Sequence, residues 1–76
     1  MKRLIVVAIG NVAENTIRFK VVSDNRSALH VATEAKDQGL IAVIGAINYE
    51  DSRDRAYTQL RGSLRKRVLE KVNSKI

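Results

Sequence analysis

The sequence predicts an α+β fold, a two-layer α/β sandwich whose elements follow the order β-β-α-β-α and end in a long C-terminal helix. Two observations predict it. Short apolar runs rich in β-branched residues are followed by segments in which apolar residues recur every three or four positions. The chain has 76 residues, which is the length of one small domain. We therefore treat residues 1–76 as a single domain.

The first two strands are predicted to form a hairpin. Residues 4–9 are a continuous β-branched run, typical of a strand buried on both faces. Residues 10–15 contain glycine and asparagine, as expected of a loop. Residues 16–23 alternate between apolar and polar, as in a strand that is buried on one face only. The apolar face of this strand carries Ile17, Phe19 and Val21, and the other face carries Arg18 and Lys20.

The first helix is predicted over residues 24–39. Ser27, Asp24 or Asn25 can cap its start, and Gly39 suits the position just beyond its end. Its apolar face is poor in bulk, consisting of Ala28, Leu29, Val31, Ala32 and Ala35. Residues 40–47 then form the third strand, again apolar on both faces, in which Gly45 marks a bulge or a close helix–sheet contact.

The last helix is predicted from about residue 52 to near the end of the chain. Asp51 and Asp54 resemble a capping box, and Gly62 is a weak point inside the helix. The apolar stripe of this helix has steps of three or four residues and consists of Ala56, Tyr57, Leu60, Leu64, Val68, Val72 and Ile76.

Hairpin pairing and a crossover helix predict a three-stranded mixed sheet of order 2-1-3. Only one face of the second strand is apolar, so we expect both helices to cover that face. The opposite face would then expose aliphatic residues, and we expect a homodimer to cover them, face to face or through an edge strand. The alternative is that the helices lie on opposite faces. The doubly apolar strands leave the register open.

The charge of the chain is concentrated in its last third. Residues 1–50 hold six bases and five acids, a net charge of +1, whereas residues 51–76 hold eight bases and three acids, a net charge of +5. Because phosphate backbones are bound by several Lys and Arg side chains on one surface, we expect a nucleic-acid-binding or regulatory protein. The candidate contact residues are Arg53, Arg55, Arg61, Arg65, Lys66, Arg67, Lys71 and Lys75.

A second hypothesis is a protein-interaction module, an inhibitor or adaptor that docks the same helix on an acidic protein surface. Bases near a helix C-terminus also have a purely structural explanation, since they complement the helix dipole. Aromatic residues are scarce, which argues against a platform that stacks single-stranded bases.

Catalysis is not expected. The chain has no cysteine, which excludes thiol chemistry and disulfides, and a single histidine, His30, which is spaced to contact Glu34 in a surface helical pair. No spacing predicts a metal site or a cofactor, and the two glycines of residues 39–45 lack the lysine of a phosphate-binding loop. The apolar runs are too short to span a membrane, so we expect a cytoplasmic protein.

Overall fold

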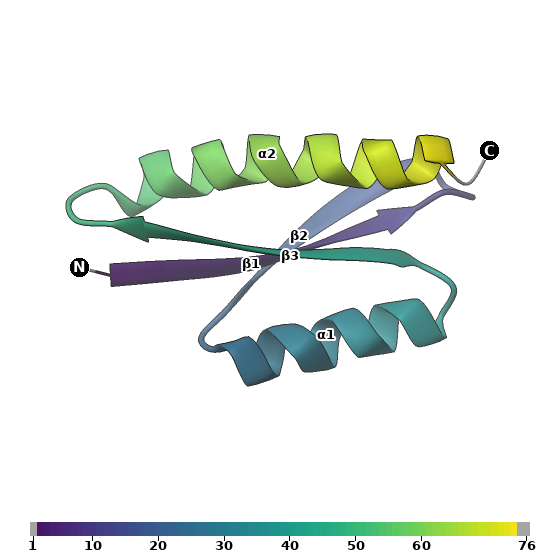
Figure 1. Ribbon diagram of the computed structural model, residues 1–76, viewed down its shortest axis with the longest axis horizontal. Helices are drawn as coiled ribbons and strands as arrows, with labels where there is room; N and C mark the ends of the chain where they lie inside the picture. The colour runs from purple at the N-terminus through teal and green to yellow at the C-terminus, as the bar shows by residue number, and fades with distance from the viewer. Residues whose placement is uncertain (1, 75–76) are drawn as a thin grey trace.

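The computed structural model describes residues 2–74 and contains three strands and two helices in the predicted order (Figure 1). The α+β class and the long C-terminal helix are confirmed. The first and third strands extend beyond their apolar runs because flanking polar residues continue the ladder, whereas the second ends one residue before its predicted end. The elements are β1 (Lys2–Asn11), β2 (Thr16–Val22), α1 (Asn25–Asp37), β3 (Ile41–Tyr49) and α2 (Arg53–Ser74).

The strand order is β2-β1-β3, as predicted, but the sheet is antiparallel rather than mixed. In one ladder Val6 pairs with Val21 of β2, and in the other Val6 pairs with Gly45 of β3. The expectation of a mixed sheet was wrong because β2 and β3 run in the same direction but never touch. β1 lies between them and opposes both.

The two helices lie on opposite faces of the sheet, so the molecule has three layers rather than two (Figure 1). On the α2 side, Leu4, Val6 and Ala8 of β1 face the helix, and on the α1 side Ile5 and Val7 do. This corrects the two-layer prediction. The helices divide between the faces because both faces of β1 and β3 are apolar, and covering only one would leave aliphatic side chains in water.

This arrangement also removes the original reason for expecting a homodimer. The face that a two-layer sandwich would leave bare is covered by α1, whose buried residues are Ala28, Ala32 and Ala35. Leu29, predicted on this face, is 64% exposed instead. It lies about 100° around the helix from Ala28, at the margin of the buried stripe.

Glycines allow α2 to approach the sheet closely. A Cβ atom built on Gly45 would lie 2.7 Å from Leu64 Cδ2, and one on Gly10 would lie 2.7 Å from Val68 Cγ1. These distances are well below van der Waals contact, so the positions tolerate no side chain without displacement. The close helix–sheet contact predicted at Gly45 is therefore present.

The helix ends are determined by local hydrogen bonds. Asp24 is the N-cap of α1, because its side-chain oxygen accepts a hydrogen bond from the Ser27 N–H at 2.7 Å. That bond favours the carboxylate and lowers the pKa of Asp24. At the other end Gly39 has a φ of 79°, and the Leu40 N–H donates to the Ala35 carbonyl at 2.9 Å, which closes the helix as predicted.

The start of α2 differs from the prediction. Ser52 rather than Asp51 caps the helix, since its hydroxyl oxygen accepts a hydrogen bond from the Arg55 N–H at 3.2 Å. Asp54 lies in the first turn, where a carboxylate stabilises the positive end of the helix dipole. The expected capping box is absent because the third helical residue is Arg55, which has no acceptor.

Candidate binding surface on the C-terminal helix

α2 forms the outer layer of one face and runs along most of the length of the molecule (Figure 1). Its 22 residues span about 33 Å, at ~1.5 Å per residue, in a molecule whose longest dimension is 39 Å. Leu60, Leu64 and Val68 anchor it to the sheet and hold its orientation. The side chains on its other faces are therefore presented to solvent on a rigid support.

Every base of α2 within the described residues is exposed: Arg53, Arg55, Arg61, Arg65, Lys66, Arg67 and Lys71. The eighth candidate, Lys75, lies outside the described residues. The helix carries two acids, Asp54 and Glu70, so its own net charge is +5. The basic surface predicted from the sequence is thus presented to solvent, although its members point in several directions.

Arg61 and Arg65 are the two candidates that the fold brings together on one flank. They are four residues apart, so one lies above the other on the side of α2 that faces β2. The Arg61 guanidinium carbon lies 5.4 Å from the centre of the Phe19 ring, a cation–π contact. The ring holds the Arg61 guanidinium beside the sheet and reduces its rotational freedom.

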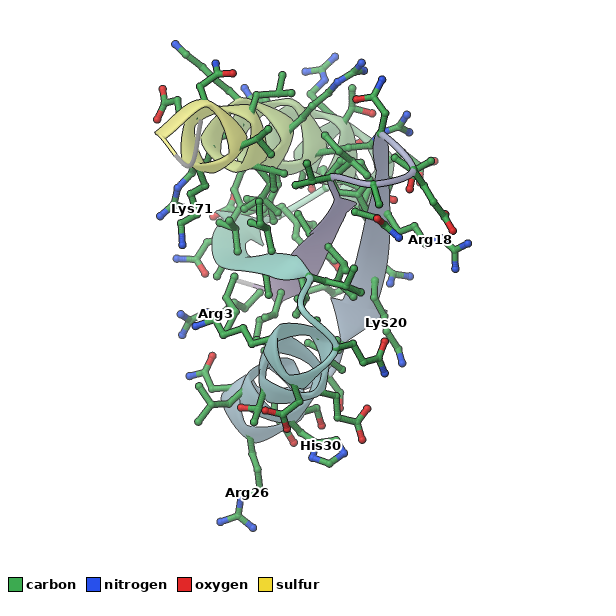
Figure 2. The ribbon with its side chains drawn as sticks, turned by 90° about the vertical axis from the view of Figure 1, so that its right-hand side faces the viewer. Arg3, Arg18, Lys20, Arg26, His30 and Lys71 are labelled. Atoms are coloured by element: carbon green, nitrogen blue, oxygen red, sulfur yellow. The ribbon has the colours of Figure 1, made fainter. Side chains whose placement is uncertain are left out.

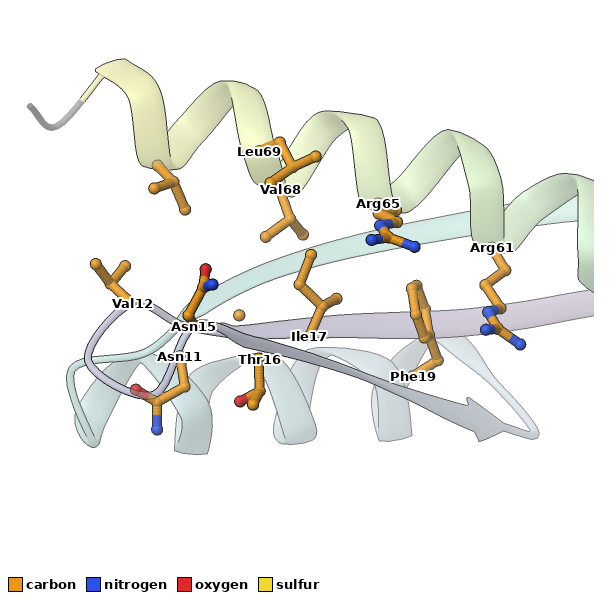
Figure 3. Close-up of a pocket in the computed structure, with 12 residues that line it drawn as sticks. Asn11, Val12, Asn15, Thr16, Ile17, Phe19, Arg61, Arg65, Val68 and Leu69 are labelled. Carbon is orange, nitrogen blue, oxygen red and sulfur yellow. The ribbon is translucent and has the colours of Figure 1, made fainter.

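These arginines form one wall of a groove between α2 and the β1–β2 hairpin (Figure 3). The groove has a volume of about 310 Å³. Its polar side chains, besides the arginines, come from the hairpin: Asn11, Asn15 and Thr16. Its apolar side chains come from both elements: Val12, Ile17, Phe19, Val68, Leu69 and Val72. No acidic residue lines it.

The hairpin's contribution to this groove was not predicted. Asn15 adopts a left-handed φ of 55°, and its N–H donates to the Val12 carbonyl at 3.3 Å, which turns the loop toward the end of α2. Val12 is 56% exposed and Leu69 is 46% exposed, so two apolar side chains are offered to solvent at the groove. The sequence marked residues 10–15 as a loop, and no local pattern placed that loop beside α2.

Three of the other candidates are separated from this flank. Lys71 lies on the side of β3, where it lines a second hollow with Lys36, and Arg55 lines a third beside the loop that follows β3. Lys66 is two residues from both Leu64 and Val68, or about 200° around the helix, so it points away from the sheet. The seven described candidates therefore do not form a single contiguous patch.

Arg18 and Lys20 do not extend the basic surface of α2. Ile17 and Phe19 of β2 pack against the α2 core, so the residues between and after them project from the opposite face of the sheet. In Figure 2, Arg18 and Lys20 lie on the right, beside β2, and Lys71 lies on the left, beside β3 and next to α2. Charge on β2 is thus a separate surface.

His30 and Glu34 form the helical pair that the sequence predicts, with a His30 Nε2 to Glu34 Oε1 distance of 3.1 Å. Both side chains are well exposed, which fits a surface interaction on α1. Within residues 2–74, no three His, Asp or Glu side chains gather closely enough to hold a metal ion. The pair lies on α1, across the sheet from the α2 groove.

None of the described helices is long and apolar enough to cross a membrane. No protein-family model matches the chain, and no curated protein and no solved structure matches it either.

Proposed function

We propose that this protein binds nucleic acid through the exposed face of α2, without catalysing a reaction. The observation that carries the proposal is the density of charge on one rigid element, where seven exposed bases accompany two acids. Nucleic acids bind such surfaces because each neutralised phosphate releases condensed counterions. The cytoplasm is the compartment in which we expect this binding to occur.

Arg61 and Arg65 are the proposed centre of the contact. Arginine forms two parallel hydrogen bonds to a phosphate, and a pair one helical turn apart suits successive phosphates of a backbone. The cation–π contact with Phe19 orients Arg61 before binding, which lowers the entropy lost on binding. Four further exposed bases add attraction along the helix: Arg55, Lys66, Arg67 and Lys71.

The aromatic side chains favour backbone contact over base stacking. Phe19, Tyr49 and Tyr57 are all partly buried against the α2 core, and Arg61 also contacts the Phe19 ring. Proteins that stack single-stranded bases use exposed rings, whereas all three rings here are drawn into the packing of the α2 core. We therefore propose binding that depends on charge and tolerates many sequences.

The test is a titration of the protein into a labelled DNA duplex and, separately, into a labelled RNA duplex. Fluorescence anisotropy monitors the binding at a series of salt concentrations. We expect binding that weakens steeply with salt. The R61E/R65E variant is expected to lower the salt slope on DNA by about 2, since each phosphate contact contributes ~0.9. The matched control is R18E/K20E, which makes the same change in charge on the opposite face and should retain more of the binding.

Three outcomes would overturn the proposal: no binding at low salt, binding that is insensitive to salt, or equal loss in both variants. The third would mean that only the net charge of the chain matters. Circular dichroism of both variants should match the unmodified protein, because all four substituted residues are exposed.

A second candidate function, docking on an acidic protein surface, is favoured by a different observation. Val12 and Leu69 offer apolar area beside Arg61 and Arg65, and no acid lines the groove. An acidic partner with apolar side chains would match this combination, whereas a phosphate backbone needs only the arginines. The Leu69→Gln variant separates the two functions, since it should weaken protein docking and leave nucleic-acid binding unchanged.

A further inference from the structure

The two edges of the sheet differ in their protection against pairing with another strand. β2 carries Arg18 and Lys20, and charged side chains on an edge strand discourage a second chain from adding to it. β3 has nine residues, none of which is charged. Its outer backbone groups face away from β1, its ladder partner. β3 is therefore the edge that is open to another strand.

An exposed leucine lies beside this open edge. Lys36 of α1 and Lys71 of α2 line one hollow together with Ile41 and Ala42, although the helices lie on opposite faces of the sheet. The hollow must therefore lie beyond the outer edge of β3. Leu29 is seven residues before Lys36, on the same flank of α1, and it is 64% exposed.

Leu29 of α1 lies beside the middle of β3. Seven helical residues cover about 10 Å, which is roughly three residues of a strand at ~3.3 Å each. α1 and β3 run in opposite directions, so this distance leads from Ile41 toward Ile44 and Gly45. If two β3 strands pair antiparallel about Gly45, the Leu29 side chains of the two copies meet near the two-fold axis.

The charges at the two ends of β3 complement each other in this pairing. Lys36 lies at the start of the strand, and Glu50 and Asp51 follow its end. A pairing centred on Gly45 places Leu40 of one copy opposite Glu50 of the other, and the same contact repeats at the far end. Residues 50–55 hold three acids, Glu50, Asp51 and Asp54, and two bases, Arg53 and Arg55, so their net charge is −1.

The flank of α2 beside β3 does not oppose this approach near the axis. Leu60 and Leu64 both lie close to Gly45, so the middle of β3 is under this part of the helix. Gln59 and Ser63, each one residue before these leucines, face the β3 side, and both are uncharged. Arg61 and Arg65 lie on the other flank, beside β2, and would stay accessible.

We propose that two copies of this chain pair through β3 to form a six-stranded antiparallel sheet with Leu29 at the two-fold axis. A two-fold axis perpendicular to the sheet places both α2 helices side by side on the same face. The exposed outer faces of both helices then look out on the same side of the dimer, which doubles the charge offered there to a polyanion, while Arg61 and Arg65 of each copy lie on the outer flanks. The proposal does not rest on nucleic-acid binding, and its test uses a separate measurement.

The test is sedimentation equilibrium of the full chain over micromolar concentrations, with Leu29→Lys and, as a matched control, Leu69→Lys. Both leucines are exposed, so both variants should fold, as checked by circular dichroism. We expect a concentration-dependent dimer whose dissociation constant rises at least about tenfold in the Leu29→Lys variant, a change of ~1.4 kcal/mol. The Leu69→Lys variant should dimerise like the unmodified protein.

Charge exchange and cross-linking locate the contact. Lys36→Glu and Glu50→Lys should each weaken the dimer, and the double variant should recover it. Because the chain has no cysteine, a short bifunctional maleimide should join two copies of a Leu29→Cys variant but not of Leu69→Cys. A protein that stays monomeric over the concentration range, or a dimer unaffected by Leu29→Lys, would overturn the proposal.

Discussion

The two helices cover the same sheet in different ways. α2 packs Leu60, Leu64 and Val68 against one face, whereas α1 packs three alanines against the other. Their exteriors differ as well: α2 has a net charge of +5, and α1 holds two bases and two acids. The bulky buried side chains of α2 anchor the helix whose outer surface carries the charge. α1 mainly shields the other face of the sheet from water.

The largest expected effect is at the anchor of α2. Leu64 is fully buried, and Leu64→Ala should lower the free energy of unfolding by about 2–5 kcal/mol, through lost burial and the cavity left behind. The comparison on the other face is Val31→Ala, which removes a half-buried side chain and should cost about 1 kcal/mol. Urea titrations of both variants measure the difference. Equal losses would contradict the unequal roles of the two helices.

The next effect is at the closest approach between α2 and the sheet. Gly45→Ala should destabilise the fold by about 1–3 kcal/mol, because the new methyl would lie 2.7 Å from Leu64 Cδ2. Combining it with Leu64→Ala should cost less than the sum of the two single changes, since the shorter side chain removes that contact. If the losses of the two single variants simply add in the double variant, as measured by urea titration, contact with Leu64 is not what excludes a side chain at position 45.

A smaller effect of opposite sign is expected on the exposed side of α2. A Cβ atom on Gly62 would meet no atom within 4 Å. Gly62→Ala should therefore stabilise the protein by about 0.5–1 kcal/mol, by reducing the backbone freedom of the unfolded chain. Thermal melting measures the change, and a lowered melting temperature would mean that the glycine is needed at this position.

The smallest effect concerns the cap of α1. The hydrogen bond from the Ser27 N–H holds the pKa of Asp24 below its usual value. The ionised Asp24 cap therefore stabilises the fold fully at pH values above the usual pKa, and this stabilisation is lost as the pH falls through the lowered pKa of the folded state. Asp24→Asn keeps a capping side chain without a titrating group. Any stability advantage of the unmodified protein should therefore shrink on acidification. A difference in melting temperature that does not change with pH would contradict this assignment.

Much of the fold was predictable from local signals. The order of elements, the closing role of Gly39 and the buried stripe of α2 follow from periodicity and helix-end chemistry, which depend on neighbouring residues. The strand order follows from the hairpin of the first two strands and the crossover helix before the third. The layering was not predictable in this way. A strand that is apolar on both faces, such as β1, gives no indication of which face each helix will cover.

The candidate site was likewise predictable in part. The basic residues of α2 were identified from the sequence, since charge is a property of composition. The groove was not, because it needs Asn15 to turn the hairpin toward α2 and Phe19 to lie beside Arg61. Asn15 and Phe19 are each more than forty positions from Arg61 in the sequence.

The sequence by itself therefore determined which segments are strands and helices and where the charge is concentrated, because these depend on local residue patterns. Only the tertiary structure decided that the helices lie on opposite faces and that Arg61 and Arg65 share a groove with the hairpin. Both outcomes depend on which segments, far apart in the sequence, cover the apolar faces of one small sheet. Local residue patterns do not specify those long-range contacts.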